Sequence, residues 1–370
     1  MSYDENERRD TPLALKLKEQ IRKSGPMPVD RFLFQCLYGA PDGTSGYYAN
    51  RPVIGSSGDF ITAPEISQVF GELIGLWCVA VWEQMGSPAA FNLIEFGPGR
   101  GTLMCDLLRA ARVRPAMLAA VRVHLLDASG PLMEQQRARL AATGVPIFWP
   151  GKFYRADDPN LPAIVIGNEF LDTEPIEQFV RTQHGWAIRS VGLNDDGSLI
   201  FVKCGDCDQA LARELDQEFP AARLGDIGEL YSAEHDFQDA LKQPKTMAGL
   251  FFDYGHTQSG IGDTLQAVRD HRYEHPLCSP GEADLTAQFD FAAFSRAQSR
   301  IRTVDGPITQ AEFLGRLGIM ERASKLMAAN PARAGEIEAG VMRLMAPNGM
   351  GTRFKAIGIR SPDVPKLPGF

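Results

Sequence analysis

Strand-like apolar segments alternate with amphipathic segments between Asn92 and about residue 170 of the 370-residue chain. The strand-like segments are NLIEF (92–96), RVHLLDAS (122–129), PIFWP (146–150) and AIVIGNE (163–169). TLMCDLLRAAR (102–112) and PLMEQQRARLAA (131–142) lie between them and repeat apolar residues at helical spacing. Apolar strands separated by such helices are typical of a parallel sheet covered on both faces. The pattern predicts an α/β fold with a Rossmann-like, doubly wound core.

Two helical patterns precede this core, at residues 11–40 and 65–86. The stretch between them, GYYANRPVIGSSGDFITAPE (46–65), has no period and is rich in Gly, Ser, Pro and aromatic residues. Irregular loops of this length are often lids over a binding site. We therefore expect residues 1–88 to form an N-terminal helical segment, which either closes over the sheet as a lid or only caps the core.

The alternation of strands and helices stops after Gln178, where strand-like runs are joined by turn signals at 184–185 and 196–197. This predicts a small antiparallel β insertion at about residues 178–245, with helical segments near 208–219 and 230–243. The core, 89–360, then resumes with AGLFFDYG (248–255). Further helices are expected at 290–302, 310–327 and 334–345, followed by a final strand, GTRFKAIGIR (351–360).

Charge and composition argue against a nucleic-acid partner and against membrane insertion. The chain has 38 basic and 46 acidic residues, so its net charge of −8 disfavours a nucleic-acid partner. No apolar run reaches the roughly 18–20 residues that span a bilayer, so membrane insertion is not expected. The acidic N-terminus, MSYDENERRD, resembles neither a signal peptide nor a transit peptide, which favours a cytoplasmic protein.

The cysteines and histidines give weak evidence for a metal site. CGDC (204–207) ends a strand-like run and lacks the second pair of a zinc ribbon. His271 and His275 lie four residues apart in HRYEH, but no third ligand is evident. We expect no bound metal and consider His271 a candidate substrate contact.

The turn after the first core strand carries the strongest chemical signal. Gly97, Gly99 and Gly101 have the spacing G-x-G-x-G, whereas a dinucleotide fingerprint requires G-x-G-x-x-G. With Glu95 two residues earlier, the spacing matches Rossmann-like methyltransferases that use S-adenosylmethionine. Missing side chains allow a nucleoside and an amino-acid tail to lie across the turn, and Pro98 stiffens it by fixing φ. The alternative to cofactor binding is that these glycines only close a tight junction between a strand and a helix.

A second acid supports the same cofactor. Asp127 ends the next strand, where related dinucleotide sites place a carboxylate that binds the ribose hydroxyls. Ser56 and Thr62 would also lie near the cofactor if the N-terminal segment closes as a lid. We therefore expect a methyltransferase core that binds S-adenosyl-L-methionine.

The acidic loop GNEFLDTEPIEQF (167–179) follows another core strand and would face the ligand crevice. Its acids, Glu169, Asp172, Glu174 and Glu177, occur with no basic residue between them, which favours a cationic substrate or a sulfonium. A guanidinium stays protonated and can be held bidentately by carboxylates, and Glu169 and Asp172 are the candidates for this role. The alternative is a solvated acidic turn.

Eight sequence blocks resemble the MidA family in order along residues 30–360. They are GYYAN, IGSSGDFITAPEISQVFGELIGLW, EFGPGRGTLMCDLLR, GNEFLDTEPIEQF, DYG, GEADLTAQFDF, FLGRLGI and MGTRFKAIGI. Eukaryotic members of this family are mitochondrial complex I assembly factors and protein arginine methyltransferases, and we expect a bacterial member here. The resemblance implies symmetric dimethylation of an arginine in the 49-kDa-type subunit of complex I.

The resemblance also implies roles for particular residues. It assigns cofactor binding to the glycine turn and places Asn168, Glu169 and Asp172 at the reaction crevice. Tyr254 of DYG is a candidate substrate contact. Two departures stand out: the family usually reads LTAH and DPL, and this chain has LTAQ and HPL. Gln288 cannot take up a proton near neutral pH as that His could.

Three other functions stay open at this stage. A non-catalytic assembly factor could keep the fold and use it to bind a partner. The support for this alternative is Gln288, which replaces the His of the family pattern. A small-molecule methyltransferase would share the cofactor pocket. An NAD oxidoreductase ranks last because the third glycine is misplaced. A homodimer is also possible.

Overall fold

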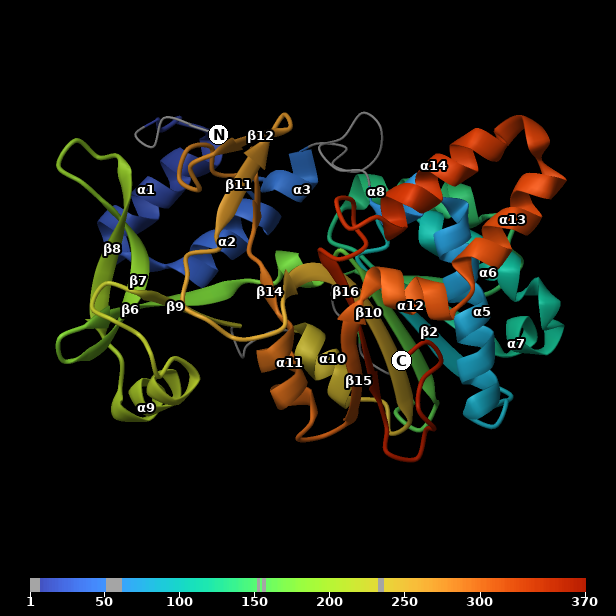
Figure 1. Ribbon diagram of the computed structural model, residues 1–370. Helices are drawn as coiled ribbons and strands as arrows, with labels where there is room; N and C mark the ends of the chain where they lie inside the picture. Colours follow the sequence, from blue (N-terminus) through green and yellow to red (C-terminus); the bar gives the residue numbers. More distant parts are fainter. Residues whose placement is uncertain (1–6, 51–61, 152–153, 155–157, 232–235) are drawn as a thin grey trace. The chain divides into compact units, whose positions relative to one another are not determined.

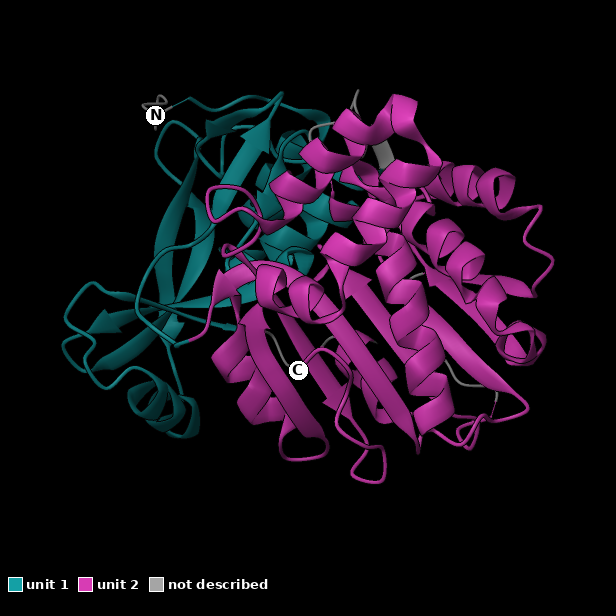
Figure 2. Ribbon diagram, turned by 45° about the vertical axis from the view of Figure 1, so that its right-hand side comes forward, with its two compact units in different colours: residues 1–53, 172–235, 258–288 teal, residues 54–171, 236–257, 289–370 magenta. Residues whose placement is uncertain are grey.

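The chain folds into two compact units in a computed structural model that describes residues 7–50, 62–151, 154, 158–231 and 236–370 (Figure 1). Unit 1 comprises Met1–Val53, Asp172–His235 and Gln258–Gln288. Unit 2 comprises Ile54–Leu171, Asp236–Thr257 and Phe289–Phe370. The two units are coloured separately in Figure 2.

Unit 2 is built on a mostly parallel sheet with the strand order β15-β16-β10-β5-β2-β3-β4. The strands are β2 (Phe91–Phe96), β3 (Val121–Leu126), β4 (Ile147–Gly151), β5 (Ala163–Asn168), β10 (Met247–His256), β15 (Thr303–Thr309) and β16 (Phe354–Arg360). The pairs of β2 with β3 and β5, of β3 with β4 and of β5 with β10 are parallel. β16 runs antiparallel to both of its neighbours, β10 and β15. The short β14 (Phe289–Asp290) pairs with the end of β10.

Helices cover both faces of this sheet. They are α4 (Ala63–Ile66), α5 (Gln68–Gln84), α6 (Thr102–Ala110), α7 (Pro115–Ala120), α8 (Gly130–Leu140), α10 (Asp236–Lys242), α11 (Phe291–Gln298), α12 (Gln310–Arg316), α13 (Ile319–Ala329) and α14 (Ala334–Met345). Successive side chains of a strand point to opposite faces. Phe252 of β10 meets Phe70 of α5 and Phe313 of α12, whereas Phe251 meets Phe237 of α10. The aromatic pairs thus show a doubly wound core, which confirms the fold class expected from the sequence.

Unit 1 contains two antiparallel sheets. In the first, β1 (Met27–Pro28), β7 (Gly185–Leu193), β6 (Ile176–Thr182) and β9 (Ile227–Tyr231) lie in that order, and β8 (Leu199–Asp206) also pairs with β7. The second consists of β12 (Arg272–Glu274), β11 (Gln266–Arg269) and β13 (Asp284–Thr286). The helices of unit 1 are α1 (Pro12–Ser24), α2 (Val29–Tyr38), α3 (Tyr47–Asn50) and α9 (Gln209–Glu218). Apolar faces of α1 and α2 share a core with side chains of both sheets, such as Val191 and Leu285.

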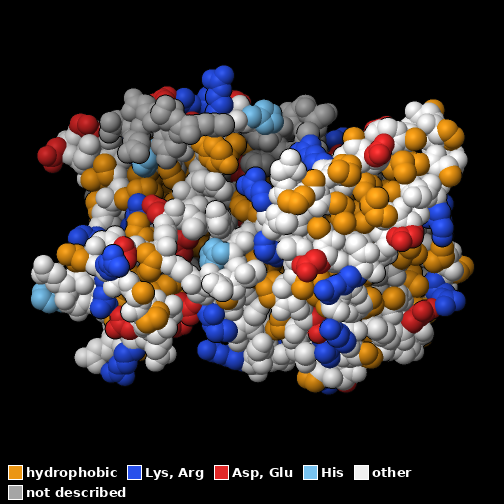
Figure 3. All heavy atoms as spheres, viewed as in Figure 1, with side chains coloured by type: hydrophobic (Ala, Val, Ile, Leu, Met, Phe, Trp, Pro, Cys, Tyr) orange, Lys and Arg blue, Asp and Glu red, His pale blue; other side chains and the backbone are white. Residues whose placement is uncertain are grey.

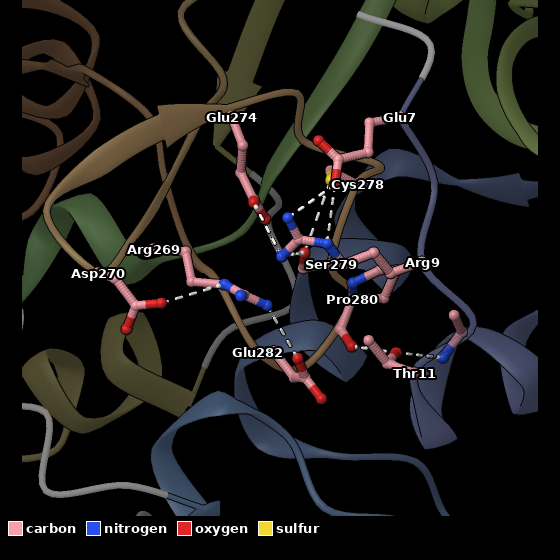
Figure 4. A network of polar contacts seen from close by, with 11 residues as sticks. Glu7, Arg9, Thr11, Arg269, Asp270, Glu274, Cys278, Ser279, Pro280 and Glu282 are labelled. Atoms are coloured by element: carbon pink, nitrogen blue, oxygen red, sulfur yellow. Dashed lines mark hydrogen bonds and ion pairs between the residues drawn. The ribbon is translucent and has the colours of Figure 1, made fainter. Parts of the chain in front are cut away.

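Polar contacts hold the N-terminal segment to the loop before β13 (Figure 4). The Arg9 guanidinium donates to the Glu7 carboxylate at 2.7 Å and to Ser279 Oγ at 3.2 Å, and the Arg9 N–H donates to the Cys278 carbonyl at 2.8 Å. The Thr11 hydroxyl donates to the Pro280 carbonyl at 2.7 Å and caps α1. These contacts make the first helices part of unit 1.

The observed units therefore differ from the boundary at residue 88 that the sequence suggested. The helices α1, α2 and α3 join the inserted strands of unit 1, whereas α5 packs into the core of unit 2. The helical pattern of α1 and that of α5 look alike in sequence. Only the buried partners of each helix assign it to a unit, and these partners lie far away along the chain.

Two smaller expectations were also wrong in detail. Residues 230–231 end β9 and are not helical, because this strand pairs with β6. The helix expected at 310–327 is broken into α12 and α13, since Gly318 adopts a left-handed conformation (φ 82°) at the start of α13. None of the described helices is long and apolar enough to cross a membrane.

Candidate cofactor and acceptor site

The glycine turn joins β2 to α6 in unit 2. Gly97, Gly99 and Gly101 have φ angles of 62°, 53° and 75°, a left-handed region that side-chain-bearing residues rarely adopt. The Gly101 N–H donates to the Pro98 carbonyl at 2.8 Å, which closes the turn. The Gly97 N–H donates to Leu126 at the end of β3 at 3.1 Å. A bare backbone thus lies at the carboxyl ends of two neighbouring strands, where α/β sheets bind their ligands.

Gln136 of α8 connects this turn to Asp127. Its side chain is fully buried, and its amide nitrogen donates to the Gly99 carbonyl at 2.7 Å and to Asp127 Oδ2 at 2.8 Å. The Trp149 indole N–H donates to the Gln136 amide oxygen at 3.0 Å, which fixes the orientation of the amide. Sequence reasoning missed Gln136, because a glutamine on an amphipathic helix looks like a surface residue.

Asp127 follows β3 and holds its carboxylate beside the turn. Besides the bond from Gln136, Asp127 Oδ1 accepts the Ser129 N–H at 2.8 Å. Burial raises the pKa of Asp127 to about 6, although these hydrogen bonds act in the opposite direction. The carboxylate is therefore mostly ionised at pH 7 and can accept hydrogen bonds from hydroxyl groups.

Glu95 lies beneath the turn and is only 2% exposed. Burial is the main cause that raises its pKa to about 8, and the negative charge of Asp127 adds to the shift. Within the described part of the chain, Glu95 Oε2 has no hydrogen-bond partner. Such an orphaned acid costs free energy unless a ligand supplies a partner.

A pocket at the turn brings most of the predicted residues together. It is lined by Thr62, Pro64, Glu65, Glu95, Gly97, Pro98, Gly99, Arg100, Thr102, Leu103, Asn168 and Glu169. Seven of these residues were expected from the sequence. Gly101 and Asp127 adjoin the pocket through their contacts with the turn and with Gln136. Ser56, the other predicted cofactor residue, lies outside the described residues.

Glu169 stands at the end of β5 in a strained conformation. Its φ of 52° is unusual for a residue with a side chain, and strain of this kind gathers at functional sites. Its N–H donates to the Phe252 carbonyl at 2.9 Å. Glu169 Oε1 accepts the N–H of Ala63 at 2.9 Å and the Asn168 amide at 3.2 Å. These bonds aim a carboxylate into the pocket.

The pocket is lined by groups that suit S-adenosylmethionine. Glu95 Oε2 and Asn168 Oδ1 are buried and have no hydrogen-bond partner among the described residues, so both are available to a polar ligand. The left-handed glycines leave the backbone uncovered, and Asp127 presents a carboxylate near the turn. A nucleoside with a polar, charged tail matches this set of groups.

These features define the class: a Rossmann-like enzyme that binds S-adenosylmethionine. Residues 73–308 match the model of a family described as S-adenosyl-L-methionine-dependent methyltransferases. The fold is also similar to that of a Burkholderia thailandensis protein described as a methyl transferase and solved with S-adenosyl-homocysteine bound. The two chains are 25% identical, with a TM-score of 0.82 over 97% of this chain and 94% of that one.

Curated relatives give the particular family. This chain is 32% identical over 377 residues to the rat protein arginine methyltransferase NDUFAF7, mitochondrial. The match covers 93% of this chain and 83% of that protein. The human protein of the same name is 33% identical over 374 residues, with 93% and 82% covered. The chain belongs to the MidA family of S-adenosylmethionine-dependent methyltransferases. The enzyme class and the cofactor expected from the glycine turn are thus confirmed.

Asp172 belongs to unit 1, although it stands three residues after Glu169 in the chain. It is buried, and its carbonyl accepts the Ala287 N–H at 3.4 Å. In the same unit, the Tyr48 hydroxyl donates to Asp284 at 3.4 Å. Burial raises the pKa of Tyr48, and the charges of Asp284 and Asp172 act in the same direction. Asp172 therefore lies in an acidic and aromatic surrounding of its own.

The candidate substrate contacts lie outside the pocket lining. His271 is exposed in the turn between β11 and β12 of unit 1, with a φ of 62°. Tyr254 lies on β10 of unit 2, and its ring packs edge-on against Phe354 at 5.7 Å. Gln288 of the LTAQ segment is exposed in unit 1. The roles of His271 and Tyr254 stay predictions.

The described residues contain no group of three His, Cys, Asp or Glu side chains that could hold a metal ion. His275, the partner of His271 in the sequence pattern, accepts the Leu277 N–H at 3.1 Å through Nδ1. Burial and the nearby charges of Arg8 and Arg189 lower the pKa of His275 to about 4. Its surroundings are those of a neutral imidazole within unit 1.

Proposed function

We propose that the enzyme methylates an arginine of a protein substrate, with symmetric dimethylation of the 49-kDa-type subunit of complex I as the specific reaction. This activity would support complex I assembly. The proposal rests mainly on Glu169, whose strained backbone and two hydrogen bonds hold a carboxylate in the pocket of the methyl donor. Relatives with 32–33% identity carry the name protein arginine methyltransferase.

The proposed donor site uses the residues around the glycine turn. Gly97, Gly99 and Gly101 expose the backbone on which the donor lies, and Pro98 limits the motion of the turn. Asp127 accepts the ribose hydroxyls, and Gln136 holds it in position. S-adenosylmethionine supplies an activated methyl group when it is bound. Glu95 and Thr62 line the same pocket and complete the proposed set together with Ser56.

The proposed acceptor site places carboxylates against a guanidinium. A guanidinium keeps its proton at neutral pH and presents several N–H donors in one plane. Glu169 would accept two of these hydrogen bonds and direct one nitrogen at the methyl carbon. That nitrogen loses one N–H proton as it takes the methyl group, and the Glu169 carboxylate would accept this proton. Asn168 orients Glu169 through its amide at 3.2 Å. Asp172, the second carboxylate predicted from the sequence, belongs to unit 1, and its role toward the guanidinium stays a prediction.

Mass spectrometry of the 49-kDa-type subunit is the direct test. The subunit is isolated from cells with and without this enzyme, and arginine methylation is expected only in the first sample. Purified enzyme, subunit and S-adenosylmethionine should reproduce the modification. Partner binding with unchanged arginine masses would instead favour a non-catalytic assembly factor, and labelling of a free metabolite would favour a small-molecule methyltransferase.

Cofactor affinity is expected to fall in acid because Asp127 accepts hydroxyl groups in its ionised form. The raised pKa of about 6 means that the unliganded carboxyl becomes protonated as the pH falls below 6. One pH unit below that value, about ten in eleven molecules would be protonated, so affinity for S-adenosylhomocysteine should fall about tenfold between pH 7 and pH 5. Calorimetric titrations at several pH values measure the effect.

Asp127→Asn is the control for this pH dependence. The amide keeps a similar shape but cannot ionise, so its affinity should be lower at pH 7 and nearly constant between pH 7 and pH 5. A wild-type affinity that does not change over this range would contradict the proposed role of Asp127. The cytoplasmic location and a homodimer also stay proposals.

A further inference from the structure

Arg100 lines the pocket at the glycine turn, which we call the donor pocket, but the proposed donor site gives this residue no role. It stands between Gly99 and Gly101, whose φ angles are 53° and 75°. The Gly99 carbonyl accepts the Gln136 amide at 2.7 Å, and the Gly101 N–H donates to the Pro98 carbonyl at 2.8 Å. Hydrogen bonds thus fix the backbone on both sides of Arg100.

Acidic side chains outnumber basic ones in the lining of the donor pocket. Glu65, Glu95 and Glu169 contribute carboxyl groups, whereas Arg100 is the single basic side chain among the described residues of the lining. A guanidinium binds carboxylates well, because its planar fork of N–H donors matches two carboxylate oxygens. The lining therefore contains one binding group for an anion and several for cations.

The Arg100 guanidinium is only loosely held by the protein. It lies 3.5 Å from Glu65 Oε2, is 34% exposed, and makes no hydrogen bond to any residue that the structure describes. Glu65 is held more firmly, because its Oε1 accepts the Thr102 hydroxyl, to which Arg139 donates in turn. Ion pairs without a hydrogen bond contribute little free energy at a partly exposed position. The N–H donors of Arg100 are therefore available to a ligand in the pocket.

The amino terminus of α6 favours an anion at the same place. This nine-residue helix begins at Thr102, and its N-cap residue, Gly101, has no side chain that could cap it. The first N–H groups of a helix have no partners within the helix, and they carry a partial positive charge. Thr102 and Leu103 line the donor pocket, so this helix end borders the space beside Arg100. Two independent groups thus attract negative charge there.

Buried acceptor atoms in the same lining require a ligand with N–H or O–H donors. Glu95 Oε2 and Asn168 Oδ1 are buried and have no hydrogen-bond partner among the described residues. An ammonium group presents three N–H donors and would satisfy such atoms. An amino acid carries an ammonium and a carboxylate on one carbon atom. The acceptors and the guanidinium of this lining therefore match the two charges of an amino acid.

Long-range attraction does not account for an anionic group in this pocket. The chain has a net charge of −8, which repels anions in general. Figure 3 shows Lys and Arg side chains interspersed with Asp and Glu side chains on the visible face of unit 2. Exposed charges are screened beyond about 10 Å at moderate salt concentration. Recognition of an anionic group therefore depends on contacts within the pocket.

We propose that Arg100 binds the α-carboxylate of the amino-acid tail of S-adenosylmethionine, beside the amino terminus of α6. The ammonium of the same tail faces the acidic side chains of the lining. Arg100 thereby makes the site specific for nucleosides with a complete amino-acid tail. This inference rests on the donor site of the proposed function, but it holds for any methyl acceptor.

Two ligands that differ only in this carboxylate test the assignment. S-adenosylhomocysteine has the complete tail, whereas its decarboxylated analogue, with an aminopropyl group on the sulfur, keeps the nucleoside and the ammonium. Each is titrated into the full-length protein by isothermal titration calorimetry. S-adenosylhomocysteine should bind about tenfold more tightly or better, because the analogue lacks a charge-assisted hydrogen-bond acceptor. Equal affinities would overturn the proposal.

Arg100→Gln assigns this preference to one side chain. Affinity for S-adenosylhomocysteine should fall about tenfold, whereas affinity for the analogue should change less than about twofold, so the preference disappears. Arg112→Gln removes the same charge from an exposed position beyond the carboxyl end of α6 and should leave both affinities unchanged. The proposal fails if Arg100→Gln keeps the full preference, or if it weakens both ligands equally.

Gly99→Val separates this assignment from the donor site on which it rests. If that variant binds both ligands as the wild type does, the placement of the cofactor on the turn fails, and the assignment of Arg100 fails with it. If it loses both ligands while Arg100→Gln treats them alike, the donor site stands and only the role of Arg100 is refuted. None of these titrations contains a methyl acceptor, so their outcome does not depend on arginine methylation.

Discussion

Gly99→Val is expected to weaken the binding of S-adenosylhomocysteine by about 100-fold or more. Gly99 lines the donor pocket with a φ of 53°, and its carbonyl accepts the bond from Gln136. The resistance of a β-branched side chain to this left-handed conformation, about 1–2 kcal/mol, lowers stability, whereas the overpacking of the donor pocket by the same side chain, about 3 kcal/mol or more, lowers affinity. Isothermal titration calorimetry measures the loss directly.

Gly144→Val separates backbone strain from occupation of the pocket. Gly144 has a φ of 76°, and a Cβ added there would meet no atom within 4 Å. This variant should lose thermal stability as Gly99→Val does, but its cofactor affinity should equal that of the wild type. Retained affinity in a folded Gly99→Val protein, checked by circular dichroism, would refute our placement of the cofactor on this turn.

The fold could be predicted because its signals are local. Each core strand from β2 to β5 is a short apolar run, and the helices between them repeat apolar residues every three or four positions. The antiparallel insertion could be predicted because its strand-like runs are joined by turn residues. By contrast, β15 was missed because TVDGPIT contains Gly and Pro and lies at the edge of the sheet, where such residues are tolerated.

The glycine turn of the candidate site could be predicted from the sequence, but the residues that support it could not. Gly97, Gly99 and Glu95 were found because their spacing reflects a backbone that must stay bare. Gln136 was missed because its role depends on burial against Gly99 and Trp149, and these contacts form only after α8 packs. Sequence spacing reports what the backbone needs, whereas the orientation of a buried amide depends on tertiary contacts.

Glu169→Gln should reduce kcat for arginine methylation by about 100-fold to 1,000-fold while cofactor affinity changes little. The amide keeps the size of the carboxylate and an oxygen that accepts the Ala63 N–H, now at 2.9 Å, but it carries no charge to hold a guanidinium. Losses of this size are typical when one preorganised polar group is removed from a transition state. Release of S-adenosylhomocysteine in the presence of the acceptor subunit measures turnover.

Two further variants give this experiment its controls. Glu134→Gln removes an exposed carboxylate of α8 and should retain full turnover. Glu169→Ala removes both the charge and the bond to Ala63, so it should also lower the unfolding temperature, because the amino terminus of α4 loses an acceptor. If Glu169→Gln were active and only Glu169→Ala were impaired, the residue would serve to cap α4. In that case the charge of Glu169 would have no part in presenting the guanidinium.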